Sequence, residues 1–356
     1  MNKVFIGEKI KAARKMSGLS MDNLVAKIDN LVSKNAISKY EKGVMVPSSS
    51  ILNALAKALD VKIDYFFTPS NLTFSQIEYR KKNSKVTKKE LTKIEYVIKD
   101  RVEKLLELEK IMGESSNFLL PIDSKDLNIK KGEEIESLVE KIRKVWNIGV
   151  DPIISVVELL EDQGIKLVDV DIEGDAFDGL SGKVGDFTVI AFNKNMPVDR
   201  KRLTILHELG HLILQFSEDL SSKEIEKLCH RFAKAFLMPR EVFVREFGGK
   251  RNVLSFEELE ALKIYFGASM QAIVYRAFEL GLISERLKNK FFRYFSQKGW
   301  REEEPGKKCH IVEEPTRFLS LLRRGVSEEK ITRNKAVALS GKSEEEILNF
   351  INLILW

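Results

Sequence analysis

The stretch RLTILHELGHLIL, residues 202–214, decides the fold of the second half of the chain. Within it, HELGH occupies residues 207–211 and supplies two of the four histidines in the sequence, His207 and His211. Residues four apart lie on the same face of an α-helix, one turn apart, so both imidazoles can bind a single metal ion. The remaining positions are largely leucine and isoleucine, which predicts a mostly buried helix.

The same five letters supply a candidate catalytic base. Glu208 lies beside His207 and can accept the proton of a water molecule, producing hydroxide for attack on a peptide carbonyl. Neutral imidazoles favour Zn²⁺, and three protein ligands leave a fourth position for water. Gly210 lets another backbone come close. The sequence therefore predicts one zinc ion per chain, with Glu208 as the catalytic residue.

A third ligand is expected from the next predicted helix, SKEIEKLCHRFAKAFLMP at residues 222–239. Glu226 on this helix would complete a His₂Glu site; the alternative is a solvated acid near the helix start. His230 follows one turn later. It could support a ligating histidine, donate to an oxyanion or compete as a ligand, and an ordinary surface histidine is equally compatible with the pattern.

The region before this helix has a mixed pattern. Residues 133–146 predict one helix, residues 151–164 a second with Pro152 in its first turn, and IKLVDVDI at 165–172 a strand. Turn glycines follow, and then a β-rich run at 187–192. This order indicates an α+β domain. We expect strand 187–192 to be a sheet edge that can pair with an extended substrate.

The front of the chain predicts five short helices within residues 7–66, with Ser20 and Ser33 as N-caps. The segment VSKNAISKYEKG, residues 32–43, buries its apolar positions and leaves polar ones near its exposed start: Lys34, Asn35, Ser38 and Lys39. Asparagine can bond adenine edges, and lysine and serine can reach phosphates or guanine. These four residues are the predicted contacts to double-stranded DNA, and the alternative is a five-helix bundle that only packs.

The charge distribution favours the DNA interpretation. Residues 1–110 hold 22 Lys and Arg against 13 Asp and Glu, whereas the whole chain has a net charge of +6. A basic front half favours nucleic acid as partner, with a solvated basic surface as the alternative. The two cysteines are too few for a disulfide framework, and no signal peptide or 18-residue apolar window is present, so we expect a cytoplasmic protein without a membrane segment.

Two further regions are helical. Residues 71–132 combine a basic linker with an amphipathic helix of some twenty residues, which could dimerise, pack on the next domain or act as a spacer. A homodimer would suit a protein that reads symmetric DNA sites. Residues 255–284 resemble a second helix-turn-helix, but Lys263 and Arg276 are its only strong basic candidates, which favours packing or partner binding over DNA. Two or three more helices follow, and Cys309-His310 is expected in a plain loop.

Two family resemblances rest on these residues. The front module resembles the XRE-type (Cro/repressor-like) helix-turn-helix family over roughly 65 residues, through Ile6-Gly7, Leu24, Ser33, Ile37-Ser38, Tyr40-Glu41, Gly43, Pro47 and ALAKALDVKIDYFF. The later part resembles the ImmA/IrrE family of metallopeptidase-like proteins, through Asn193, Arg202, HELGH, Glu226, Phe232-Ala233 and Leu237-Met238-Pro239. The second resemblance implies a zincin-like fold with His207, His211 and Glu226 as ligands and Glu208 as base.

The expected protein is therefore multidomain: an all-α helix-turn-helix domain at 1–70, the linker and helix at 71–132, an α+β zincin-like peptidase domain at 133–248 and a C-terminal helical region at 249–356. The expected function is a DNA-binding transcriptional regulator that cleaves a protein such as a repressor or toxin-related partner, since proteases of the resembled family inactivate repressors under stress or in mobile elements. The alternative is a non-enzymatic regulator or antitoxin whose metal domain senses or binds a partner. A nuclease is disfavoured because one metal lacks the paired-metal site that nucleases use.

Overall fold

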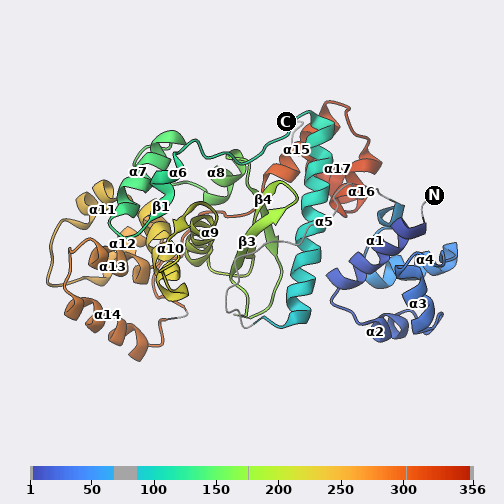
Figure 1. Ribbon diagram of the computed structural model, residues 1–356, viewed down its shortest axis with the longest axis horizontal. Coiled ribbons are helices and arrows are strands. Elements are labelled where there is room, and N and C mark those ends of the chain that lie inside the picture. Colours follow the sequence, from blue (N-terminus) through green and yellow to red (C-terminus); the bar gives the residue numbers. More distant parts are fainter. Residues whose placement is uncertain (1–2, 68–85, 175, 302, 353–356) are drawn as a thin grey trace.

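The computed structural model describes residues 3–67, 86–174, 176–301 and 303–352. A helical N-terminal domain, a mixed α/β middle part with small sheets and a set of C-terminal helices form the molecule (Figure 1), which confirms the predicted multidomain class. None of the described helices is long and apolar enough to cross a membrane.

The N-terminal domain consists of α1 (Lys3–Met16), α2 (Met21–Lys27), α3 (Lys34–Glu41), α4 (Ser49–Leu59) and a 3₁₀ helix, η1 (Ile63–Phe67), in place of a fifth α-helix. The predicted N-caps are confirmed: the Ser20 and Ser33 hydroxyls accept hydrogen bonds from the backbone N–H groups of Asn23 and Ala36, three residues further along. A buried bidentate ion pair between Arg14 and Glu41 links α1 to α3.

Gly7 explains how closely α1 and α3 pack. A Cβ atom at this position would lie 2.2 Å from the Tyr40 carbonyl oxygen and 2.9 Å from that of Glu41. Because no side chain fits this gap, only glycine allows the two helices to approach to this distance.

Helix α5 (Lys88–Met112) stands between the N-terminal domain and the rest of the molecule (Figure 1). Ile94, Ile98 and Val102 pack against the main sheet, and Leu105 and Leu108 pack against the C-terminal helices. Packing on the neighbouring domains is therefore the role that the structure shows for this helix. Residues 71–85 of the predicted basic linker lie outside the described residues.

Contacts on another face of α5 hold the N-terminal domain. The Lys9 ammonium group forms an ion pair with Glu103 at 3.1 Å. Tyr65 is hydrogen-bonded to Asp100, and its pKa is raised by burial and by the nearby Asp100 and Glu103 carboxylates. Lys62, just before η1, donates a 2.6 Å hydrogen bond to the Lys342 carbonyl between α16 and α17. This bond connects the N-terminal domain to the C-terminal helices.

The middle part contains α6 (Ser124–Leu127), β1 (Asn128–Ile129), α7 (Glu134–Val145), α8 (Val156–Asp162), β2 (Lys166–Val170), β3 (Gly179–Val184), β4 (Phe187–Asn193), α9 (Val198–Ile213), β5 (Gln215–Phe216), α10 (Ser222–Leu237) and α11 (Arg240–Phe247). In the main sheet the strand order is β2-β4-β3, with β4 parallel to β2 and antiparallel to β3. The short strands β1 and β5 pair in parallel.

Two predictions in this part are wrong. The run 187–192, expected at a sheet edge, is the central strand β4, because residues 179–184 form an additional strand that pairs with it. A turn with Gly185 at φ 57 connects the two strands. The helix expected over 151–164 begins only at Val156, since Ser155 is its N-cap and Pro152 lies outside it.

The C-terminal helices divide between two cores. Helices α12 (Phe256–Phe266), α13 (Met270–Glu279) and α14 (Glu285–Gln297) share one large core with α7 to α11. Helices α15 (Arg317–Ser327), α16 (Arg333–Ser340) and α17 (Glu344–Asn352) pack instead beside α5. The predicted C-terminal region, residues 249–356, therefore contributes to both of these cores.

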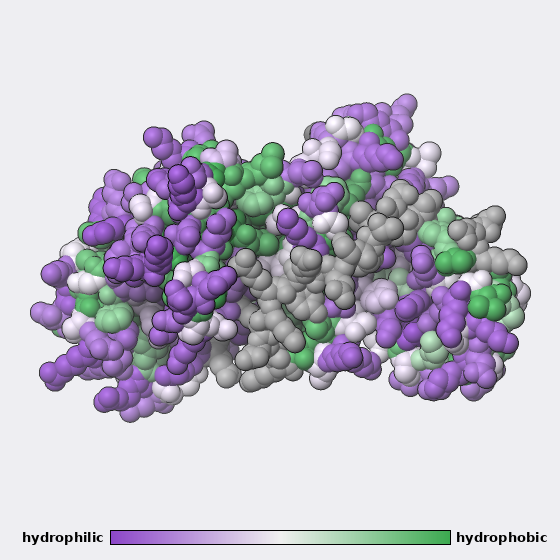
Figure 2. Space-filling model, in the orientation of Figure 1, coloured by the Kyte–Doolittle hydropathy of each residue, from purple (hydrophilic) through white to green (hydrophobic). Residues whose placement is uncertain are grey.

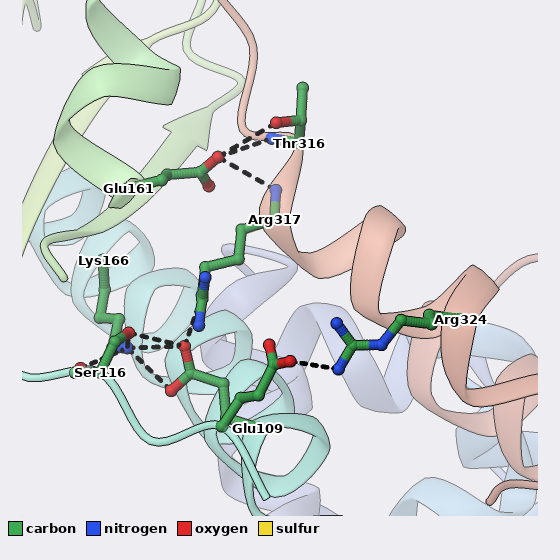
Figure 3. A network of polar contacts seen from close by, with 8 residues as sticks. Glu109, Ser116, Glu161, Lys166, Thr316, Arg317 and Arg324 are labelled. Carbon is green, nitrogen blue, oxygen red and sulfur yellow. Dashed lines mark hydrogen bonds and ion pairs between the residues drawn. The ribbon is translucent and has the colours of Figure 1, made fainter. Parts of the chain in front are cut away.

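A polar network fixes α5, β2, α8 and α15 to one another (Figure 3). Buried Glu109 on α5 accepts hydrogen bonds from the Lys166 ammonium group and the Arg317 guanidinium, each at 2.8 Å. Glu161 on α8 accepts from the backbone N–H groups of Thr316 and Arg317, at 3.0 Å each. Burial lowers the pKa of Lys166 and raises that of Glu161, so each charge depends on these partners.

Candidate metal centre

Three side chains converge between helices α9 and α10. His207 and His211 lie one turn apart on α9 and are buried, and the Glu226 side chain on α10 is 35% exposed. The two Nε2 atoms are 3.0 Å apart, and each lies 3.2 Å from a Glu226 carboxylate oxygen. Within the described part of the chain, these residues form the one group of histidine, cysteine and acidic side chains placed to hold a metal ion.

The spacing of these donors fits a zinc-sized ion. Tetrahedral coordination with bonds of about 2.0–2.1 Å places ligand atoms about 3.3 Å from one another. The Nε2–Nε2 distance of 3.0 Å and the distance of 3.2 Å from each Nε2 to its nearer Glu226 oxygen (Oε2 for His207, Oε1 for His211) are close to this requirement. Two imidazoles and one carboxylate are also a donor set found at catalytic zinc sites. The residues present therefore fit the group that the sequence predicts.

Close packing of α9 on α10 brings Glu226 to the histidines. A Cβ atom on Gly210 would lie 3.2 Å from the Phe232 ring and 3.5 Å from the Cys229 Cα. A larger residue would therefore press the helices apart, which is the close approach predicted for this glycine. A capping box formed by Ser221 and Glu224 fixes the start of α10, one turn before Glu226.

Glu208 follows His207 on α9 and contacts strand β3. Its carboxylate is buried and accepts a 2.8 Å hydrogen bond from the Ser181 hydroxyl. Gly179 on the same strand provides room, because a Cβ atom there would lie 2.8 Å from Thr204 Cγ2 and 3.4 Å from Glu208 Cγ. No motif marks Ser181, since the contact joins residues 27 positions apart, and sequence reasoning missed it.

His230 and Cys229 flank the ligands. The His230 ring lies at 4.1 Å from the His207 ring, centre to centre, and its residue is exposed. Cys229 is buried, and its sulfur lies 3.5 Å from Nδ1 of His211. A partner on this nitrogen fixes the orientation of the ring, which would leave Nε2 free to bind a metal ion. The role of Cys229 had no sequence signal beyond its position beside His230.

Asn193 and Arg202, on which the ImmA/IrrE resemblance partly rests, form contacts that stabilise the fold. The Asn193 side-chain amide donates to the carbonyls of Ile172 and Phe177, which closes the connection between β2 and β3. Arg202 is fully buried, forms an ion pair with Glu313 and donates to the Ile153 carbonyl. Neither side chain is part of the triangle of ligands.

The candidate DNA contacts lie together on α3. Lys34, Asn35 and Lys39 are exposed and Ser38 is half-buried, all on the face that begins at the helix N-terminus. Lys34 forms an exposed ion pair with Asp22 at 2.7 Å, of a kind that contributes little to stability. The structure thus places all four residues on one accessible helix face.

The second pair of helices, α12 and α13, offers no comparable basic face. Lys263 is buried and pairs with Glu304 at 3.1 Å. Arg276 is fully buried and forms two hydrogen bonds to Glu136, at 2.6 and 2.7 Å. Because both cations are occupied inside the protein, the predicted packing role is the one their positions support.

Comparisons with known proteins agree with both resemblances. Residues 10–66 match the family model described as helix-turn-helix, and residues 160–278 match that of the IrrE N-terminal-like domain. The chain therefore contains a helix-turn-helix domain of the XRE type fused to an ImmA/IrrE-type metallopeptidase-like domain, as the two patterns predicted.

Curated relatives resemble a short part of the chain. They include uncharacterized HTH-type transcriptional regulators of Rickettsia prowazekii and Rickettsia conorii. Each is 44% identical over 63 residues, which is 18% of this chain and 47% and 49% of the respective relative. The chain spans about half the length of these relatives.

Proposed function

We propose that the chain is a DNA-binding transcriptional regulator whose second domain is a zinc-dependent peptidase acting on a protein partner. The observation that carries this proposal is the convergence of His207, His211 and Glu226, with Nε2 and carboxylate oxygens 3.0 to 3.2 Å apart, next to the buried carboxylate of Glu208. A site that only binds metal has no need of Glu208.

In this mechanism His207, His211 and Glu226 would hold one zinc ion. When bound, zinc lowers the pKa of water and polarises a substrate carbonyl. Glu208 accepts the proton of the attacking water and passes it to the departing amine. Ser181 holds the Glu208 carboxylate in position through its hydrogen bond. His230, whose ring lies on that of His207, supports the orientation of this ligand.

The substrate in this proposal is an extended peptide segment paired with β3. Among the described residues β3 (Gly179–Val184) is a terminal strand of the main sheet, and it carries Ser181, the partner of Glu208. Backbone pairing binds a peptide with little dependence on its sequence. A repressor or a toxin-related protein is the partner class that the ImmA/IrrE resemblance suggests.

DNA recognition is assigned to α3, through Lys34, Asn35, Ser38 and Lys39. The exposed face that these residues share supports insertion into a major groove, with Asn35 as the reader of adenine. Binding as a homodimer to a symmetric operator belongs to the same proposal. In functional terms we divide the chain into a DNA-binding unit at 1–70, a connecting segment at 71–132, a peptidase unit at 133–248 and a helical region at 249–356.

The experiment compares the unaltered chain with Glu208→Gln and with Glu218→Gln, a control at an exposed acid. Zinc content is measured in each protein, and each is incubated with itself and with the proteins encoded by neighbouring genes. The proposal expects about one zinc per chain in all three and cleavage by all except Glu208→Gln. Zinc without any cleavage would favour a sensor or partner-binding domain, and the lack of divalent metal binding would leave a DNA-binding regulator alone.

A further inference from the structure

A groove of about 410 Å³ lies where the N-terminal domain meets the first turn of α5. One wall is the turn between α1 and α2, with Lys15, Gly18 and Ser20. The other wall is the start of α5, with Lys88 and Lys89. The two walls are about seventy positions apart in the sequence and meet only because α5 packs on α1.

Four lysines lie at the groove, whose exposed surface is otherwise mostly apolar. Lys88 and Lys89 are exposed, Lys15 is half-buried, and the Lys93 side chain lies 3.8 Å from the Cβ position of Gly18. None of these four lysines forms an ion pair with another residue of the described segments. Like charges held together at a surface repel one another and attract an anionic partner.

The other charged groups of the groove do not cancel this charge. Arg14 also lines it but is neutralised by Glu41, to which it is bonded through two nitrogens. Glu90 is the acidic residue of the first turn of α5, and its carboxylate, which accepts from the Thr87 hydroxyl and backbone N–H, keeps its negative charge. Four lysines against this one carboxylate leave a net positive charge at the groove.

The groove is continuous with the candidate DNA-binding face. Ser20, on its wall, is the N-cap of α2, the helix before α3. In helix-turn-helix complexes the first helix of the motif crosses the DNA backbone while the second lies in the major groove. Figure 2 shows hydrophilic side chains over α2, α3 and the adjoining lower end of α5.

We propose that this groove binds phosphates of the DNA backbone beside the site read by α3. Lys15, Lys88 and Lys89 are the residues that make the contacts, and the ligand is the phosphodiester chain of duplex DNA. The Lys9–Glu103 ion pair joins α5 to α1, so the two helices that carry these lysines are positioned before DNA binds. The proposal rests on the DNA-binding part of the proposed function and does not depend on the peptidase.

The test measures binding of the full chain to a mixed-sequence duplex of about 40 base pairs over a range of salt concentrations, since phosphate contacts are independent of sequence. Lys88→Gln/Lys89→Gln is compared with Lys130→Gln/Lys131→Gln, a consecutive exposed pair on the connection before α7 that changes net charge equally. A third variant, Lys34→Gln/Lys39→Gln, removes charge from α3. Thermal unfolding confirms that each variant is folded.

The proposal expects the slope of log K against log salt concentration to fall by about 1.8 for Lys88→Gln/Lys89→Gln, because each phosphate contact contributes about 0.9. The control pair should leave the slope unchanged. If the α3 variant lowers the slope but the α5 variant equals the control, the groove is not a phosphate site and the DNA-binding function stands. If the unaltered chain does not bind duplex DNA, the DNA-binding function itself fails, and the groove proposal with it.

Discussion

Ser181 on β3 donates a 2.8 Å hydrogen bond to Glu208 on α9, and both side chains are buried. This contact joins the outer strand of the main sheet to the helix that carries both histidines. The strand that would hold a peptide and the carboxylate that would act on it are therefore fixed to one another.

Replacing Ser181 by alanine should lower kcat for partner cleavage about ten- to hundredfold, since a hydrogen bond to a charged group contributes about 1.5–3 kcal/mol. Zinc content should not change, because Ser181 does not contact the three ligands. The measurement is the cleavage rate at saturating partner together with metal analysis. Ser181→Thr keeps the hydroxyl and should retain most activity; equal rates for alanine and serine would contradict the role assigned to this contact.

Gly179→Ala should destabilise the fold by about 1–3 kcal/mol, because the added methyl group overpacks the contact of β3 with α9. The nearest atom, Thr204 Cγ2 at 2.8 Å, belongs to a side chain that can be shortened. Thr204→Ser should therefore recover part of the loss, while the Ala191 carbonyl at 3.1 Å keeps the rescue incomplete. Urea unfolding of the two single variants and the double variant tests this, and additive losses would count against the contact.

Metal removal should lower the thermal stability of the unaltered chain, since a ligand that binds only the folded state at about 100 times its Kd adds roughly 2.7 kcal/mol. His207→Ala should unfold at a lower temperature, and adding a chelator should not lower it further. His310→Ala, at an exposed histidine of the C-terminal loop, is the matched control and should respond to the chelator like the unaltered chain. The measurement is the unfolding temperature of each protein with and without chelator. A chelator-induced decrease for His207→Ala would contradict the proposed site.

Glu313→Gln should cost about 3–5 kcal/mol, because it leaves the Arg202 guanidinium without its counter-charge in the interior. The Glu313 carboxylate also accepts from the backbone N–H groups of Val156 and Val157 at the start of α8, each at 2.9 Å. The double change Arg202→Leu/Glu313→Leu should cost less than the sum of its single changes. Denaturant unfolding measures each free energy, and strict additivity would show that the pair is not coupled.

Asn35→Ala should weaken binding to a duplex selected by the unaltered protein by about 1–3 kcal/mol and relax the base preference at one position. Binding to a mixed-sequence duplex should change little, because Asn35 carries no charge. Titrations with both duplexes separate the two effects. Equal losses on both would mean that Asn35 does not read a base.

The sequence by itself determined most of the local structure and two of the candidate metal donors. Ser20 and Ser33 cap helices because their hydroxyls reach N–H groups three residues ahead, which is a purely local property. His207 and His211 share a helix face because they are four residues apart. The helical period of α5 likewise depends only on residues close in the sequence. The surfaces against which α5 packs do not follow from these residues.

Only the tertiary structure decided how distant segments meet. Packing of α9 on α10 at Gly210 places Glu226 within 3.2 Å of both histidines, and pairing of β3 outside β4 moves the sheet edge from 187–192 to 179–184. The tertiary structure also brings Ser181 to Glu208 and Glu313 to Arg202, residues that are 27 and 111 positions apart in the sequence. Helix periodicity and caps arise from adjacent residues, whereas strand order and ion-pair partners depend on which apolar faces are buried together, and that is settled only when the whole chain packs.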